Sequence, residues 1–335
     1  MNRRLVILLG FILLANVLKA QQQPVYSQYM MNPFLLNPAI AGYQGYTDFN
    51  LVAREQWLGY GDGPSTYSLS GQTRILRTSY RNRSRIIKSR RRRRRPSGRV
   101  GYGGYVYNDK NGAMSRTGFQ GTYSYHIYVR DIQYSAGVSL SAFQFRADVT
   151  TDDLFDSNDQ SLNSIRPVYS PDANVGFLVS SEQFYAGVSA TNLFQNLISF
   201  GSGQNELAYK LPRYYYVLAG YKYQERRADY GFEPSIMVGF TDRAITTAFS
   251  ERNYWSIDFN FKAIYKDNYW AGVSFRTTGT IISMFGLNYQ NFYLGYAFDY
   301  SYGDLSNFNR MGSHEIMLGM KIGDSSRRYR WLNRF

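Results

Sequence analysis

The strongest constraint on the fold of this sequence is a repeated two-residue alternation of apolar and polar side chains. In the stretch 131–142, every second position is apolar: Ile132, Tyr134, Ala136, Val138 and Leu140. The same alternation occurs in 254–263, 291–302 and 314–322. Alternation over eight to twelve residues places one apolar and one polar face on a strand, and a helix would not produce it. The sequence therefore predicts an all-β fold.

Two all-β architectures compete, and strand length separates them. A soluble sandwich or propeller has strands of about five or six residues, whereas a transmembrane barrel needs tilted strands of about nine to eleven. The alternating segments here are long, and their polar faces carry Gly, Ser, Asn and Tyr. With 32 tyrosines and 17% aromatic residues, the chain can form the aromatic girdles of a membrane barrel. We expect a transmembrane outer-membrane β-barrel.

The expected strands number about fourteen and are antiparallel, and an even number is usual for single-chain bacterial barrels. They are 46–57, 66–77, 100–108, 114–129, 131–146, 172–181, 183–190, 213–224, 229–241, 253–264, 269–277, 280–289, 291–302 and 313–322. The barrel domain is therefore expected to span 46–322.

The connections between these strands fall into two alternating classes. One class is short, as at 130, 181–182 and 289–291, and the other tends to be long, as at 147–171 and 191–212. Bacterial barrels place short turns in the periplasm and long loops outside. The segment 78–99 is the one long member of the short class, so it is expected to be a basic periplasmic turn.

The N-terminus predicts the compartment. Residues 1–20 combine Arg3 and Arg4 with an apolar stretch from Leu5 to Leu14 and end at Ala20, which is the pattern of a cleaved signal peptide. The apolar stretch is shorter than the roughly 20 residues of a spanning helix. An exported barrel is expected in the bacterial outer membrane, in contact with its lipids. The absence of cysteine excludes a disulfide framework.

The formal net charge of +14 suggests nucleic-acid binding until it is located. Thirteen basic residues and no acid lie between Arg74 and Arg99, including the run Arg90, Arg91, Arg92, Arg93, Arg94 and Arg95. Without this cluster and the signal peptide, the rest of the chain is close to neutral. For an exported protein with one local basic cluster, we expect no nucleic-acid partner.

Motifs for catalysis or cofactor binding are weak. His126 and His314 lie in separate expected strands, where a girdle or lumen position is the simpler interpretation. The stretch 314–318 lacks the second histidine of a metalloprotease motif, and 151–161 lacks the spacing of a calcium loop. We expect no enzymatic activity, no cofactor and no metal, although spacing alone does not exclude an outer-membrane enzyme.

Residues 21–45 precede the first expected strand and contain the steps Asn32–Pro33 and Asn37–Pro38, which disfavour a regular helix or a ladder strand. We expect an extended segment that either plugs the barrel or reaches a periplasmic partner. The stretch QQPVYSQYMMNPFLLNPAIAGYQGY (22–46) resembles the start of the PorP/SprF family of type IX secretion system membrane proteins. Further matches follow at 54–71, 107–112, 184–196 and 296–318.

This resemblance implies a non-enzymatic barrel that serves a secretion and gliding-motility machinery. It also implies support for export or surface attachment of secreted adhesins, and periplasmic partners that bind peptidoglycan. The candidate partner-binding residues are Tyr26, Gln28, Tyr29, Asn32, Pro33, Asn37, Pro38 and Arg90 to Arg95. The basic tail 323–335 is expected on the same side as the arginine run. The alternative is a passive porin or transporter, because fourteen strands leave room for a pore.

Overall fold

The structure is a computed structural model, and its described residues are 26–59, 63–75, 99–112, 114–147, 167–200, 207–224, 228–242, 244–246, 250–252, 255–302 and 311–322. The expected signal peptide, the run Arg90 to Arg95 and the tail 323–335 lie outside these ranges.

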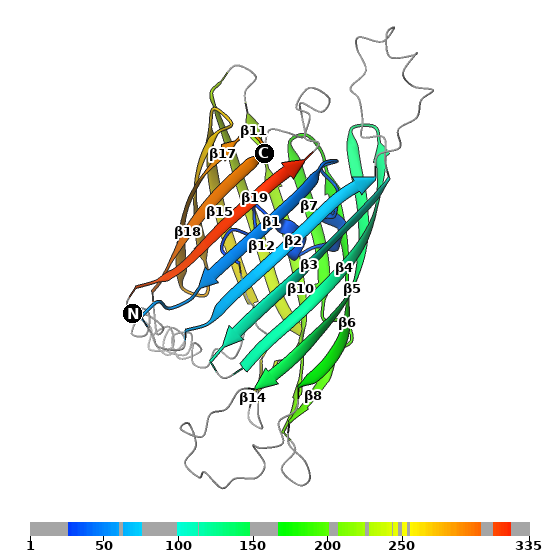
Figure 1. Cartoon of the computed structure of the whole chain (residues 1–335). Coiled ribbons are helices and arrows are strands. Elements are labelled where there is room, and N and C mark those ends of the chain that lie inside the picture. Colours follow the sequence, from blue (N-terminus) through cyan, green and yellow to red (C-terminus); the bar gives the residue numbers. More distant parts are fainter. Residues whose placement is uncertain are drawn as a thin grey trace, which may run out of the picture.

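Within the described ranges, fourteen strands form one closed antiparallel sheet (Figure 1). They are β1 (Thr47–Glu55), β2 (Ser65–Ile75), β3 (Val100–Asn111), β4 (Met114–Val129), β5 (Ile132–Ala147), β6 (Val168–Ser180), β7 (Phe184–Thr191), β10 (Arg213–Tyr221), β12 (Tyr230–Asp242), β15 (Trp255–Tyr265), β16 (Tyr269–Arg276), β17 (Thr280–Tyr289), β18 (Phe292–Ser301) and β19 (Ser313–Ile322). The short β11 (Tyr223–Gln224) continues β10 in the same register against β12.

Each strand pairs with its neighbours in the sequence, which is the up-and-down arrangement of a membrane barrel. The first and last strands, β1 and β19, pair along their whole length from Thr47–Ile322 to Glu55–His314. Closure leaves no free sheet edge, which a bilayer would not tolerate.

The fourteen expected strands are confirmed. The main differences are at the ends: β6 begins at Val168 rather than 172 and includes Pro171. Two further hairpins, β8 (Leu197–Phe200) with β9 (Leu207–Lys210) and β13 (Ala244–Thr246) with β14 (Ser250–Arg252), lie within connections that were expected to be loops. Strands of three or four residues are too short to show a two-residue period.

The barrel buries polar residues and exposes apolar ones, the reverse of a soluble protein. Outward-facing Leu140 is 69% exposed and Phe119 is 60% exposed, while inward-facing Asn50 and Ser135 are each 1% exposed. An apolar exterior around a polar lumen is the pattern that a bilayer selects. Among the described residues there is no helix with the length and apolar character needed to cross a membrane.

The two ends of the barrel differ in their connections. At one end, here called the turn end, the connections β4–β5, β6–β7, β15–β16 and β17–β18 have two or three residues. The other end, here called the loop end, carries most of the long connections, such as 192–212 between β7 and β10, whereas the long connection 76–99 between β2 and β3 belongs to the turn end. By the general rule for bacterial barrels, the turn end faces the periplasm.

Aromatic side chains mark both membrane boundaries. Exposed aromatic residues near the turn end are Phe184, Tyr230, Tyr265, Tyr269, Tyr289 and Phe292, and those near the loop end are Tyr67, Tyr169, Trp255 and Tyr300. Amphipathic rings at the headgroup level are the girdles that such barrels use.

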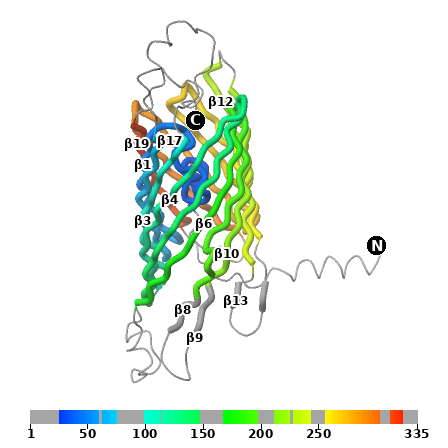
Figure 2. Tube along the Cα trace, turned by 90° about the vertical axis from the view of Figure 1, so that its right-hand side faces the viewer, coloured from blue at the N-terminus to red at the C-terminus, as the bar shows by residue number. Residues whose placement is uncertain are grey.

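Residues 26–46, here called the lumen segment, lie inside the barrel (Figure 2). The segment contains two short 3-10 turns, η2 (Pro33–Leu35) and η3 (Pro38–Ile40). Its described part is therefore compact, whereas the sequence suggested an extended path. Each turn starts at a proline that follows an asparagine, because proline suits the first helical position, where an N–H has no partner.

Candidate functional site

The lumen segment crosses the barrel from the loop-end half to the turn end. Ser27 and Gln28 contact Glu315, which lies near the loop end of β19. Tyr43 lies beside Arg74 near the turn end of β2, and the chain then enters β1 at Thr47. The segment thus runs along the lumen wall from the loop-end half to the turn end. Its contacts with that wall define the candidate site.

The first anchor is a buried charge network at Ser27. Its backbone N–H donates to a Glu315 carboxylate oxygen at 2.7 Å, and its hydroxyl donates to Asp299 at 2.7 Å. Arg54 of β1 forms ion pairs with Asp299 at 2.7 Å and with Glu315 at 3.2 Å, and it also donates to the Ser27 hydroxyl. Three strands and the lumen segment are therefore joined through one arginine. Hydrogen bonds to charged groups are the stronger kind.

Gln28 extends this anchor. Its N–H donates to the other Glu315 oxygen at 2.9 Å, and its side-chain amide donates to the Glu315 carbonyl at 3.2 Å. The next contact is at Tyr29, whose hydroxyl accepts from the Asn260 amide at 2.5 Å.

The two Asn-Pro steps hold the middle of the segment. Asn32 precedes η2 and donates its side-chain amide to the Ser70 hydroxyl at 2.9 Å. Asn37 caps η3 by accepting from the Ala39 N–H at 2.9 Å. The Asn37 amide also donates to the carbonyls of Phe177 at 3.1 Å and Val188 at 3.2 Å, on β6 and β7. Asn37 therefore closes the turn with one hydrogen bond and connects it to the wall through two more.

Glycines in the wall make room for the segment. A Cβ atom at Gly137 of β5 would collide with the backbone of Pro38 and Ala39, and one at Gly101 of β3 would collide with the Ala41 carbonyl. Since these neighbours are backbone atoms, a side chain there would require a shift of the segment. The sequence shows glycines in strands, but not that they form a seat for the lumen segment.

At the turn end, wall side chains bind the backbone of the segment. The Ala41 carbonyl accepts from the Ser124 hydroxyl at 2.6 Å and lies 3.0 Å from the Nε2 atom of His126. His126 is fully buried, so the sequence interpretation of a lumen position fits this histidine. The Gly42 N–H donates to the Gln72 side chain at 3.1 Å. These contacts fix the entry of the chain into β1.

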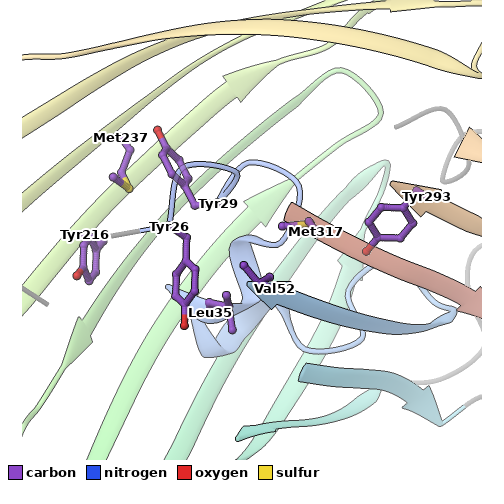
Figure 3. Packing of buried hydrophobic residues seen from close by; sticks show 8 residues of the cluster. All are labelled: Tyr26, Tyr29, Leu35, Val52, Tyr216, Met237, Tyr293 and Met317. Atoms are coloured by element: carbon purple, nitrogen blue, oxygen red, sulfur yellow. The ribbon is translucent and has the colours of Figure 1, made fainter. Parts of the chain in front are cut away.

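Apolar contacts complete the seat (Figure 3). The largest buried cluster combines residues of the lumen segment with residues of the wall: Tyr26, Tyr29, Leu35, Val52, Tyr216, Met237, Tyr293 and Met317. In a second cluster, Phe34 and Ile40 pack against Leu178 and Leu218. The polar lumen therefore contains an apolar core whose two halves come from the segment and the wall.

All seven candidate residues in the N-terminal segment, Tyr26, Gln28, Tyr29, Asn32, Pro33, Asn37 and Pro38, lie in the lumen. Six of them are buried, and Pro33 is half-buried. In this arrangement, their contacts are with the barrel's own wall. The arginine run Arg90 to Arg95 is outside the described residues, but the pairing of Ile75 with Val100 places both flanks of that connection at the turn end.

Several wall residues of this site were missed at the level of sequence. Arg54 lies on the first expected strand, and Asp299 and Glu315 lie on the polar faces of the last two, far from it in the chain. Charged residues on a lumen face were the available signal, since an ionised group there needs a partner. Among the described residues there is no group of three or more His, Asp or Glu side chains arranged to hold a metal ion.

The closed sheet, the apolar exterior and the polar, filled lumen define an outer-membrane β-barrel with an internal plug, located in the bacterial outer membrane. Within this class, the chain belongs to the family described as "Type IX secretion system membrane protein PorP/SprF", whose sequence pattern matches residues 18–320. The resemblance in the motifs at 22–46 and 296–318 is thereby confirmed.

Solved barrels show more distant similarity. The TodX monoaromatic hydrocarbon channel deltaS2 mutant is 9% identical at a TM-score of 0.44, covering 87% of this chain and 92% of its own. BamA from Haemophilus ducreyi lacking POTRA domains 1–3 is 10% identical at a TM-score of 0.38, covering 83% and 70%. No curated protein matches the sequence. At these scores, the architecture rests on the strand pairing of the chain itself.

Proposed function

We propose that this protein is a closed docking component of the type IX secretion and gliding machinery. It supports export or surface attachment of specific secreted adhesins, and on its periplasmic side it contacts secretion-system proteins that bind peptidoglycan. It performs this role without an enzymatic reaction. The observation that carries the proposal is the filled lumen in a member of this family, because a plugged barrel serves better as a platform than as an open pore.

The filled lumen weakens the alternative of a passive porin or transporter. The lumen segment is held by hydrogen bonds, some of them to charged wall side chains, and by apolar contacts from both halves of the chain. Diffusion through such a barrel would require this segment to leave its seat. Single-channel conductance of the intact protein in planar bilayers tests this, with a variant lacking residues 21–45 as the comparison.

We expect no large, stable conductance from the intact protein and larger openings from the deletion variant. A large open pore in the intact protein would contradict the docking proposal. A deletion variant that does not fold is replaced by Gly137→Leu, which displaces the segment while keeping the whole chain.

The partner side of the proposal is tested in cells. Removal of the protein should prevent a specific adhesin from reaching the surface, while other exported proteins still do. Tagged protein from native membranes should co-purify with a peptidoglycan-binding partner. Normal surface display of every adhesin in the absence of the protein would contradict the proposed role.

The arginine run Arg90 to Arg95 is part of this proposal. Its flanks meet at the turn end, and guanidinium groups suit carboxylates and phosphates of a partner or of lipid headgroups. Replacement of the six arginines by Gln should reduce co-purification of the periplasmic partner. Unchanged co-purification with normal assembly would remove the run from the docking surface.

A further inference from the structure

A cavity near the turn end lies between the lumen segment and the barrel wall. Its lining includes three lysines, Lys222, Lys262 and Lys321, and two acids, Asp48 and Glu233. The rest of the lining is Leu178, Tyr185, Leu218 and Tyr293 of the wall and Met30, Met31, Pro33, Ile40, Tyr43, Gln44 and Tyr46 of the lumen segment. The cavity is thus built from both parts of the plugged barrel.

The charged residues form two rows on different sides of the cavity. In the first row, Glu233 of β12 pairs in register with Lys262 of β15, and the two are joined by an ion pair of 2.8 Å. The registers of β10 and β11 place Lys222 opposite Glu233 on its other side. This row therefore reads Lys–Glu–Lys across three neighbouring strands.

The second row lies on β1 and β19. Asp48 pairs in register with Lys321, and the hydroxyl of Tyr293 donates to Asp48 at 3.0 Å. The Lys321 ammonium lies 4.8 Å from the centre of the Tyr293 ring and 5.7 Å from that of Tyr46. On the other side, the Lys222 ammonium lies 5.4 Å from the centre of the Tyr185 ring. Both lysines are thus held by rings that line the cavity.

The described lining carries three ammonium groups and two carboxylates. Three ammonium groups around one cavity between the plug and the wall favour an anion there, because charges removed from water need opposite charges close by. Each ammonium carries three N–H donors, and contact with a ring face still permits donation to an oxyanion.

The size of the cavity limits what it can hold. Its volume is about 40 Å³, while one water molecule requires roughly 10–15 Å³. The space suits a small oxyanion group and excludes a large organic body.

We propose that this cavity is a binding site for a small oxyanion, namely a phosphate or carboxylate group, held by Lys222, Lys262 and Lys321. The bound anion would contact the wall and the lumen segment together, so its binding would stabilise the plugged state. The proposal does not depend on the secretion role, and the experiments below use neither an adhesin nor a periplasmic partner.

The test measures binding of inorganic phosphate to the full-length protein in detergent, by calorimetry and by the midpoint of thermal unfolding. Chloride at the same ionic strength is the reference. We expect saturable binding and a rise in the unfolding midpoint with phosphate. Acetate distinguishes the two sources: a response to acetate as well indicates carboxylate recognition, and a response to phosphate alone indicates a phosphate site.

Variants assign the site. Lys222→Gln and Lys321→Gln should each weaken phosphate binding about tenfold or more, while Lys222→Arg should retain most of it. Lys110→Gln is the matched control, because Lys110 is exposed on the outward face of β3. Each variant is first shown to fold by its heat-dependent shift in gel mobility.

Glu233→Gln gives a test of opposite sign. Removal of this negative charge from the lining should strengthen phosphate binding, so a loss of binding caused only by misfolding is distinguishable from the proposed effect. The proposal is overturned if neither phosphate nor acetate binds saturably to the intact protein, or if Lys110→Gln and Lys222→Gln bind equally well.

Discussion

The backbone N–H of Ser27 donates a 2.7 Å hydrogen bond to the carboxylate of Glu315, although 288 positions separate the two residues. Glu315 also accepts from the N–H of Gln28 and pairs with Arg54. One carboxylate therefore connects the start of the lumen segment with both strands that close the barrel. The lumen segment is therefore attached to the wall at the point where β1 and β19 close the barrel.

Replacing Glu315 by Gln tests this connection. The shape is retained, but the two N–H donors lose a charged acceptor, and hydrogen bonds to charged groups contribute about 1.5–3 kcal/mol. About 1.4 kcal/mol corresponds to a tenfold change in an equilibrium constant, here that of local opening. The amides of Ser27 and Gln28 should therefore exchange hydrogen roughly 10- to 100-fold faster in the variant than in the unaltered protein. Glu55→Gln is the control, since Glu55 bonds the exposed Tyr67 hydroxyl outside the lumen. Equal exchange in both variants would contradict the anchor.

Gly137→Leu should displace the lumen segment, because a side chain at Gly137 meets the backbone of Pro38 and Ala39. We expect larger and more frequent conductance events in planar bilayers. Gly121→Leu is the matched control on β4, since a Cβ atom there meets nothing within 4 Å. Identical conductance in the two variants would mean that the segment does not depend on this seat.

Asn37→Ala should loosen the middle of the segment more than Asn32→Ala does. Asn37 makes one hydrogen bond within the turn and two to wall carbonyls, whereas Asn32 makes one, to Ser70. At about 0.5–1.5 kcal/mol per hydrogen bond, Asn37→Ala should lower the free energy of local opening by about 1–3 kcal/mol more than Asn32→Ala, because it removes two more hydrogen bonds. Hydrogen exchange at Ala39 and Ile40 measures it. Greater exchange in Asn32→Ala would reverse the proposed ranking.

The pair Arg276 and Asp258 tests the charged lumen independently of the plug anchor. Arg276 contacts Asp258 through both its Nε and its NH2 group, at 2.9 and 2.8 Å, and both side chains are buried. Asp258→Leu alone should cost about 3–5 kcal/mol, because it leaves a buried charge without its partner. The double variant Asp258→Leu/Arg276→Leu should be destabilised less than this. Urea unfolding followed by tryptophan fluorescence measures both, and additive losses would contradict the coupling.

The strands of this protein could be predicted from local sequence. A half-buried strand needs one apolar and one polar face, so the alternation in stretches such as 131–142 is a direct consequence of its surroundings. The alternation also separated the outward Leu140 from the inward Ser139. Short turns at Arg130 and Gln290 ended the strands cleanly, and both residues adopt positive φ angles of 57° and 54°.

The site could be predicted only in part. The Asn-Pro steps marked the lumen segment as unusual, and proline following asparagine explains the start of each 3-10 turn. Their wall partners gave no comparable signal. Ser70, Ser124 and Ser189 all bind the segment. They lie on the same kind of polar face as Ser139, which bonds Gln120 and Thr122 instead, so nothing local distinguishes them.

The sequence by itself therefore determined the barrel, because the bilayer and the strand period act on each residue locally. Tertiary structure alone decided that residues 26–46 fold into the lumen, that Glu315 meets Ser27, and that three lysines share one cavity. Those contacts depend on the register around fourteen strands and on side chains that chain folding brings together across the barrel. A local sequence pattern does not contain the information about which residues meet across the barrel.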